Sequence, residues 1–114
     1  MAQNKTLKIT VVGCGRWGSL ITWYLDRSGH SLTLYGRESS ANMQRFISER
    51  RNDLLELSER VKLSTSYDCL VDADVIIISI ASQALRGFMK EISSLGLKNK
   101  IFVLPKKPLK ILKI

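Results

Sequence analysis

Three glycines at positions 13, 15 and 18 follow a short apolar run, in the segment I-T-V-V-G-C-G-R-W-G of residues 9 to 18. The spacing G-x-G-x-x-G is typical of a turn where a strand reverses into a helix and holds the pyrophosphate of a dinucleotide. Gly13 would form the tight turn, Gly15 would let phosphates approach the main chain, and Gly18 would let the helix pack closely on the strand. The segment therefore predicts a dinucleotide-binding site.

The residues on both sides of the glycines supply the context that this motif requires, because a strand must precede it and a helix must follow it. At the start of that helix, N–H groups without intrahelical partners and the positive end of the helix dipole would attract the pyrophosphate. The alternative is a glycine-rich turn that binds no ligand. The apolar residues before the turn are Leu7, Ile9, Val11 and Val12, and the helical pattern after it comprises Trp17, Leu20, Ile21, Tyr24 and Leu25.

A second position with chemical meaning comes about 20 residues after the glycines, where a predicted strand ends at Tyr35 and is followed by Gly36, Arg37 and Glu38. The ribose of the cofactor's adenosine meets the side chain at this place. An acid here would bind the ribose hydroxyls and repel a 2′-phosphate, whereas an arginine can pair with that phosphate through two hydrogen bonds. Arg37 favours NADP over NAD; the alternative is that Arg37 is solvated and Glu38 contacts the ribose.

The elements that must position these residues alternate between strand-like and helix-like segments. This order predicts an α/β fold, a Rossmann-type doubly wound parallel sheet with helices on both faces. The unbroken apolar run from Val75 to Ile80 indicates a central strand buried on both faces. We expect strands at 7–12, 31–35, 61–64, 75–80 and 101–104, and helices at 16–28, from Ser39 or Ser40 to 51, at 67–71 as a short turn, and at 83–94.

Composition limits the other classes of function. The 114 residues predict one domain, and no apolar run is long enough for a membrane span or a secretory signal, so we expect a cytoplasmic protein without a membrane partner. The net charge is +8, but basic and aromatic residues do not alternate as in single-strand binders, and we expect no nucleic acid partner. Cys14 and Cys69 predict reduced thiols rather than a metal site, and His30 lies far from the glycines.

The chain resembles a known family at three places: G-C-G-R-W-G, then G-H-S-L-T-L-Y-G-R, then D-A-D-V-I-I-I-S-I-A-S-Q-A-L-R. Together they resemble the N-terminal, dinucleotide-binding domain of bacterial NAD(P)-dependent glycerol-3-phosphate dehydrogenase over about residues 7 to 104. The tryptophan inside the glycine turn and the S-Q-A-L-R segment are the distinctive features. The latter argues against a third class, relatives of 2-hydroxy-acid or ketopantoate reductases.

The resemblance implies functions for individual residues. Arg16, Trp17 and Arg37 match family positions that contact the cofactor, and no catalytic residue is carried over to this chain. Two residues depart from the family pattern: Arg16 replaces a small residue, and Ala81 replaces a proline before S-Q, which leaves the backbone path there open. An arginine beside a pyrophosphate is chemically compatible with the predicted site.

After Leu104 the family continues with a lysine-glycine segment that touches cofactor and substrate, followed by a helical substrate domain, whereas this chain reads P-K-K-P-L-K-I-L-K-I. Lys107 is the better match to that lysine, with Lys106 as the alternative. Residues 1–104 would then form the dinucleotide-binding domain and residues 105–114 a basic tail, with the substrate domain absent. A truncation or a frame change near Leu104 would produce such an end, and a sheet that stops there predicts exposed apolar surface and self-association.

The resemblance implies an oxidoreductase of glycerol-3-phosphate metabolism and phospholipid biosynthesis. Its reaction is hydride transfer between NAD(P)H and dihydroxyacetone phosphate. Cofactor binding is assigned to Gly13, Gly15, Arg16, Trp17, Gly18, Arg37 and Lys107. The substrate would bind only together with the missing domain, so we expect little turnover by this chain alone. The alternative is a non-enzymatic dinucleotide-binding or interaction module.

Overall fold

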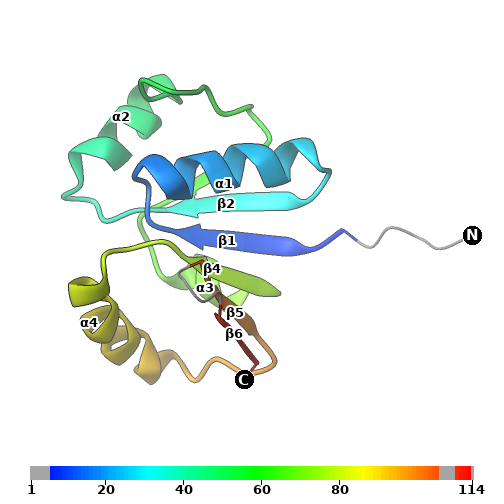
Figure 1. Cartoon of the computed structure of the whole chain (residues 1–114), viewed down its shortest axis with the longest axis vertical. Helices are drawn as coiled ribbons and strands as arrows, with labels where there is room; N and C mark the ends of the chain where they lie inside the picture. Colours follow the sequence, from blue (N-terminus) through cyan, green and yellow to red (C-terminus); the bar gives the residue numbers. More distant parts are fainter. Residues whose placement is uncertain (1–5, 106–109, 114) are drawn as a thin grey trace, which may run out of the picture.

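The computed structural model describes residues 6–105 and 110–113, which form one sheet flanked by helices (Figure 1). The strands are β1 (Lys8–Val12), β2 (Ser31–Tyr35), β3 (Lys62–Ser64), β4 (Val75–Ile78), β5 (Ile101–Leu104) and β6 (Lys110–Lys113). The helices are α1 (Arg16–Arg27), α2 (Ala41–Glu49), α3 (Asp68–Val71) and α4 (Ser82–Ile92), and a 3-10 turn, η1 (Ser93–Leu95), follows α4. The predicted α/β class is confirmed.

The strand order is β3-β2-β1-β4-β5-β6, in which the first five strands are parallel and β6 pairs antiparallel with β5. The chain runs outward from β1 to β3 and then crosses back to β4 on the other side of β1. Helices α1 and α2 cover one face, and α3 and α4 cover the other (Figure 1). In a sheet of this topology, ligands bind at the carboxyl ends of the strands where the order reverses, here between β1 and β4.

Burial explains why the central strands read as continuous apolar runs. All four residues of β4 are buried, and so are the last four of β1, because helices cover both faces of the sheet. One core cluster lies under α1 and α2 and includes Leu34, Met43 and Phe46. The other lies under α3 and α4 and includes Ile76, Phe88 and Phe102.

The helix boundaries follow local capping chemistry. The Ser40 hydroxyl accepts a hydrogen bond from the Met43 N–H at 3.2 Å, which selects Ser40 rather than Ser39 as the N-cap of α2. Gly29, with φ +96°, follows the end of α1 as predicted for a C-terminal glycine. Near the end of α1, the carboxylate of the buried residue Asp26 forms an ion pair with Arg60 at 3.0 Å. The same carboxylate accepts a hydrogen bond from the Ser58 hydroxyl at 3.0 Å.

The structure differs from the sequence prediction at the end of β4 and in the segment after β5. β4 stops at Ile78 instead of Ile80, and Ser79 and Ile80 turn over the glycine segment. The segment expected to be a tail contributes β6, which uses the free edge of β5. Five residues separate β5 from β6, too few for a crossover helix, so the pairing is antiparallel.

We expect Ile76→Ala to lower the free energy of unfolding by about 2–5 kcal/mol, because the Ile76 side chain is fully buried in the central strand. Val71→Ala on α3, where the side chain is more than half exposed, is the control and should change it by less than about 0.5 kcal/mol. Urea unfolding followed by circular dichroism measures both. Equal losses would mean that Ile76 is not in the core.

Candidate functional site

The glycine turn lies at the carboxyl end of β1, held from both sides by backbone hydrogen bonds. The Gly13 N–H donates to the Tyr35 carbonyl of β2 at 2.9 Å, and the Ser79 N–H donates to the Val12 carbonyl at 2.8 Å. These bonds extend the two ladders that flank β1 by one residue each. The turn is therefore positioned by β2 and β4 together.

Two of the three glycines are required by close backbone contacts. A Cβ added to Gly13, whose φ is +111°, would lie 2.2 Å from the Ser79 carbonyl oxygen, and one added to Gly18 would lie 1.8 Å from the Gly13 carbonyl oxygen. The N–H groups of Gly13 and Ser79 are hydrogen-bonded to neighbouring strands, so neither carbonyl can move far. Gly13 and Gly18 thus set how closely α1 approaches the sheet, as their positions in the motif predict.

Gly15 has the opposite environment, because a Cβ placed on it would meet no heavy atom within 4 Å. It is the N-cap residue of α1, and the first turn of this helix contains no acidic residue. N–H groups that lack intrahelical acceptors begin here, so positive potential faces open space. This arrangement fits an anionic group such as a pyrophosphate.

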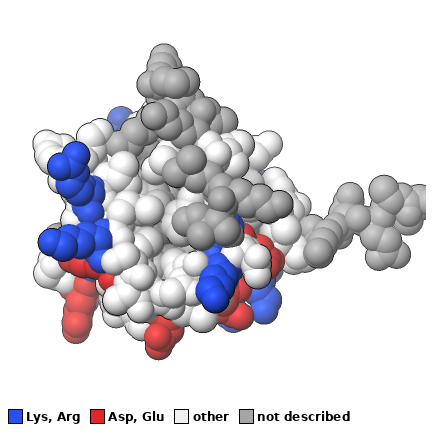
Figure 2. Space-filling model, turned by 90° about the horizontal axis from the view of Figure 1, so that it is seen from below, with Lys and Arg blue, Asp and Glu red and all other residues white. Residues whose placement is uncertain are grey.

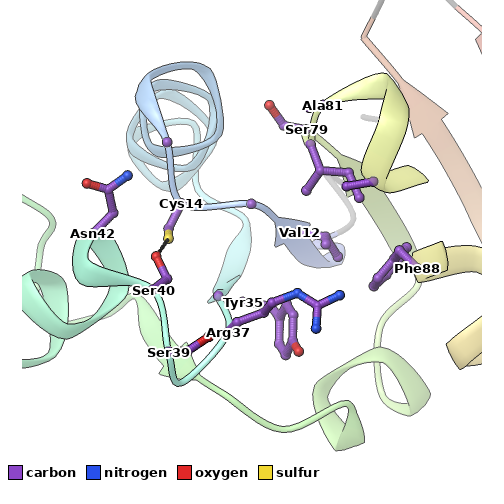
Figure 3. A pocket seen from close by; sticks show the side chains of 15 residues that line it. Val12, Cys14, Tyr35, Arg37, Ser39, Ser40, Asn42, Ser79, Ala81 and Phe88 are labelled. Atoms are coloured by element: carbon purple, nitrogen blue, oxygen red, sulfur yellow. Dashed lines mark hydrogen bonds between the residues drawn. The ribbon is translucent and has the colours of Figure 1, made fainter. Parts of the chain in front are cut away.

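A cleft of about 370 Å³ opens on the β2 side of the turn (Figure 3). Its walls come from the ends of β1 and β2, the segment before α2, and the loop between β4 and α4. In Figure 3, the Arg37 side chain extends in front of the Tyr35 ring toward Phe88, whereas Glu38 does not line the cleft. The lining residues are Val12, Gly13, Cys14, Gly15, Tyr35, Gly36, Arg37, Ser39, Ser40, Asn42, Ser79, Ile80, Ala81, Ala84 and Phe88.

A second cleft, of about 320 Å³, lies on the β5 side and shares Gly15 and the Ser79 to Ala81 segment with the first. Arg16, Trp17 and Pro105 complete its wall. Trp17 is 69% exposed, so it does not pack α1 against the sheet. The glycine turn thus lies between two clefts that share part of their lining.

Ala81 has φ −62° and ψ 148°, a conformation that proline also adopts. The change from the family's proline to alanine therefore keeps the extended residue that precedes α4. The path left open by the sequence is the proline-like one.

Several lining residues were not predicted from the sequence. The Cys14 thiol lies 3.5 Å from the Ser40 hydroxyl, a contact that joins the glycine turn to the N-cap of α2. Tyr35 stacks on Tyr67 at 5.2 Å between ring centroids, and Tyr67 meets Phe88 edge-on at 5.9 Å. Ser79 carried no usable signal, because the central strand was predicted to continue through it to Ile80.

His30 and Cys69 line neither cleft, whereas Cys14 lines the first one. His30 Nδ1 accepts the Leu7 N–H at 3.3 Å, a structural contact at the opposite end of β1. Both cysteines are free thiols, as predicted, and burial raises the pKa of Cys69. Lys106 and Lys107 lie outside the described residues. Within residues 6–105 and 110–113, no group of three or more metal-ligating side chains is placed to hold an ion.

Charge on the described surface is mixed. Figure 2 shows basic side chains beside acidic ones around the edge of one face, with uncharged residues between them. The described part of the chain contains no helix with the length and hydropathy of a membrane span.

Comparisons with known proteins agree with this geometry. Residues 8–111 match the family model described as the NAD-dependent glycerol-3-phosphate dehydrogenase N-terminus. The match extends seven residues beyond Leu104, into the segment that contains the start of β6.

Among curated relatives, the glycerol-3-phosphate dehydrogenase of Thermoanaerobacter sp. (strain X514) is 27% identical over 101 residues, which are 85% of this chain and 30% of that protein. The enzyme of Corynebacterium glutamicum (strain R) is 32% identical over 89 residues, or 75% and 27% of the two chains. The chain thus spans about 30% of the length of these relatives. The crystal structure of glycerol-3-phosphate dehydrogenase from Coxiella burnetii shares the fold, with TM-score 0.77 and 20% identity over 85% of this chain and 31% of that one.

The contrast between the glycines gives a test of the turn. We expect Gly18→Ala to destabilise the chain by at least about 3 kcal/mol, because its Cβ would overlap a fixed carbonyl oxygen. Gly15→Ala should cost less than about 1 kcal/mol, since its Cβ would enter open space at an N-cap. Urea unfolding compares them, and a stable Gly18→Ala variant would contradict the packing described for α1.

Proposed function

Because the chain belongs to the NAD-dependent glycerol-3-phosphate dehydrogenase family, whose N-terminal model it matches over residues 8–111, we propose that it binds NAD(P) in the two clefts beside the glycine turn. The observation that carries the proposal is the open space at Gly15, at the start of α1 and between both clefts. An anionic pyrophosphate placed there would leave one nucleoside on each side.

The residue roles follow from this placement. Gly13 and Gly18 keep α1 close to β1, while Gly15 and the adjacent Arg16 face the phosphates. Tyr35 and Arg37 receive the adenosine end in the first cleft. Trp17 borders the nicotinamide end in the second cleft. Lys107 is assigned to the cofactor by family resemblance.

We assign a preference for NADP over NAD on the basis of Arg37. Its guanidinium lies at the end of β2, where the adenosine ribose is expected, and it can form two parallel hydrogen bonds to a 2′-phosphate. The acid that would disfavour this phosphate, Glu38, is exposed and does not line the cleft.

The proposed reaction is the reversible reduction of dihydroxyacetone phosphate, to which the bound cofactor contributes the hydride. The residues of this chain bind and orient the cofactor, and the Ser79 to Ala81 backbone with Trp17 forms the wall next to its reactive ring. No residue of this chain is assigned to substrate binding or proton transfer, so we expect the chain alone to bind cofactor without appreciable turnover. A spectrophotometric assay with dihydroxyacetone phosphate tests this point. Rapid NADPH oxidation would contradict it.

Cofactor binding should follow the geometry of Gly15. Fluorescence titration with NADPH and with NADH, in a Trp23→Phe background so that Trp17 reports, should give saturable binding. Gly15→Ala should weaken both by more than about tenfold, because its Cβ would occupy the space assigned to the pyrophosphate. Glu49→Gln, on the far end of α2, is the control and should bind as the parent does. If neither dinucleotide binds to the folded parent chain, the proposed function is wrong.

The preference for NADP is tested separately at the end of β2. Arg37→Gln should weaken NADPH binding by about ten- to a hundredfold, since a charge-assisted pair is lost, and change NADH binding by less than about threefold. Glu38→Gln should leave NADH binding within about twofold. A large loss of NADH affinity in Glu38→Gln would instead assign the ribose to Glu38.

A further inference from the structure

The Arg37 guanidinium forms an ion pair with Glu91. Its Nη2 lies 3.5 Å from the Oε1 of Glu91, a residue that does not itself line the first cleft. Arg37 follows β2, whereas Glu91 lies in the last turn of α4. Figure 3 shows the Arg37 side chain extending toward Phe88, which lies three residues before Glu91 on the same helix.

A third residue orients the carboxylate. The Tyr67 hydroxyl donates a hydrogen bond to the same Glu91 Oε1. Tyr67 is itself held between the rings of Tyr35 and Phe88, and both of these line the cleft. The Tyr67 hydrogen bond, with Arg37 nearby, lowers the pKa of Glu91, while burial and the carboxylate raise the pKa of Tyr67. Glu91 is therefore anionic and Tyr67 is a proton donor at neutral pH.

We propose that Glu91 is a specificity-determining residue that competes with the 2′-phosphate of the dinucleotide for Arg37. This inference rests on the proposed function and names a residue that restrains its cofactor preference. Arg37 is the cation available to a 2′-phosphate in the cleft lining. A phosphate monoester carries between one and two negative charges near neutral pH, so it must displace or approach the Glu91 carboxylate to reach Arg37.

The geometry favours this role over one in stability. The Arg37 and Glu91 side chains are 56% and 45% exposed, and exposed ion pairs contribute little to folding. The aromatic contacts nevertheless keep Tyr67, and through it the carboxylate, facing Arg37. A cofactor with a free 2′-hydroxyl brings no charge to this place, so Glu91 opposes only the phosphorylated dinucleotide. The chain would consequently accept both cofactors with a modest preference.

The test measures dissociation constants for NADPH and NADH by Trp17 fluorescence in the Trp23→Phe background. Glu91→Gln keeps the shape of the side chain and removes its charge. It should tighten NADPH binding by about three- to tenfold and change NADH binding by less than about twofold. Glu38→Gln and Glu49→Gln are matched controls that remove the same charge elsewhere. Glu38 is the sequence neighbour of Arg37, and Glu49 lies on α2. Both variants should leave the ratio of the NADPH and NADH dissociation constants unchanged.

A double-variant cycle asks whether Glu91 acts through Arg37. In an Arg37→Gln background, Glu91→Gln should improve NADPH binding by less than about twofold. Unchanged or weaker NADPH binding in Glu91→Gln, with normal thermal unfolding, would overturn the inference, and so would a full gain that persists without Arg37. These outcomes presuppose that the parent chain binds both dinucleotides. Failure of the parent to bind either one would instead reject the proposed function.

Discussion

The contact between α1 and the end of β1 determines the rest of the site. Gly18 approaches the Gly13 carbonyl so closely that a single added carbon would lie 1.8 Å from that oxygen, and Gly13 packs in turn against the Ser79 carbonyl. These are contacts between backbone groups, which cannot rotate away as side chains do. They place the start of α1 directly above the switch point of the sheet and leave open space only at Gly15. The site that we propose for the pyrophosphate follows from this packing.

Much of this arrangement could be predicted from the sequence because it depends on local patterns. The G-x-G-x-x-G spacing, the run that begins at Val75 and the serine pair at 39 and 40 each indicate a conformation through neighbouring residues, although the sequence did not choose between the two serines as the cap. β2 was predicted with its observed bounds for the same reason. The glycines were assigned different roles from the motif alone, and the contacts around Gly13 and Gly18 agree with those roles.

Other features depend on residues far apart in the sequence. Nothing local to Glu91 indicates that it meets Arg37, 54 positions earlier, because α4 reaches the end of β2 only once the sheet has formed. The aromatic group of Tyr35, Tyr67 and Phe88 likewise joins a strand, a loop and a helix. β4 was predicted two residues too long because Ile80 continues the apolar run past Ser79, whereas in the structure the Ser79 carbonyl packs against Gly13. The β6 pairing depends on the free edge of β5, which a residue pattern does not encode.

The site therefore combines two kinds of interaction with different tolerances to change. In the proposed site, the pyrophosphate position depends on buried backbone, where a substitution at Gly13 or Gly18 would disturb the sheet and the first helix together. The proposed choice between cofactors depends instead on exposed side chains, Arg37 and Glu91, whose pairing contributes little to folding. On this proposal, substitutions at Arg37 and Glu91 can change the cofactor preference while the backbone of the glycine turn stays fixed. Cofactor preference and pyrophosphate position depend on separate contacts.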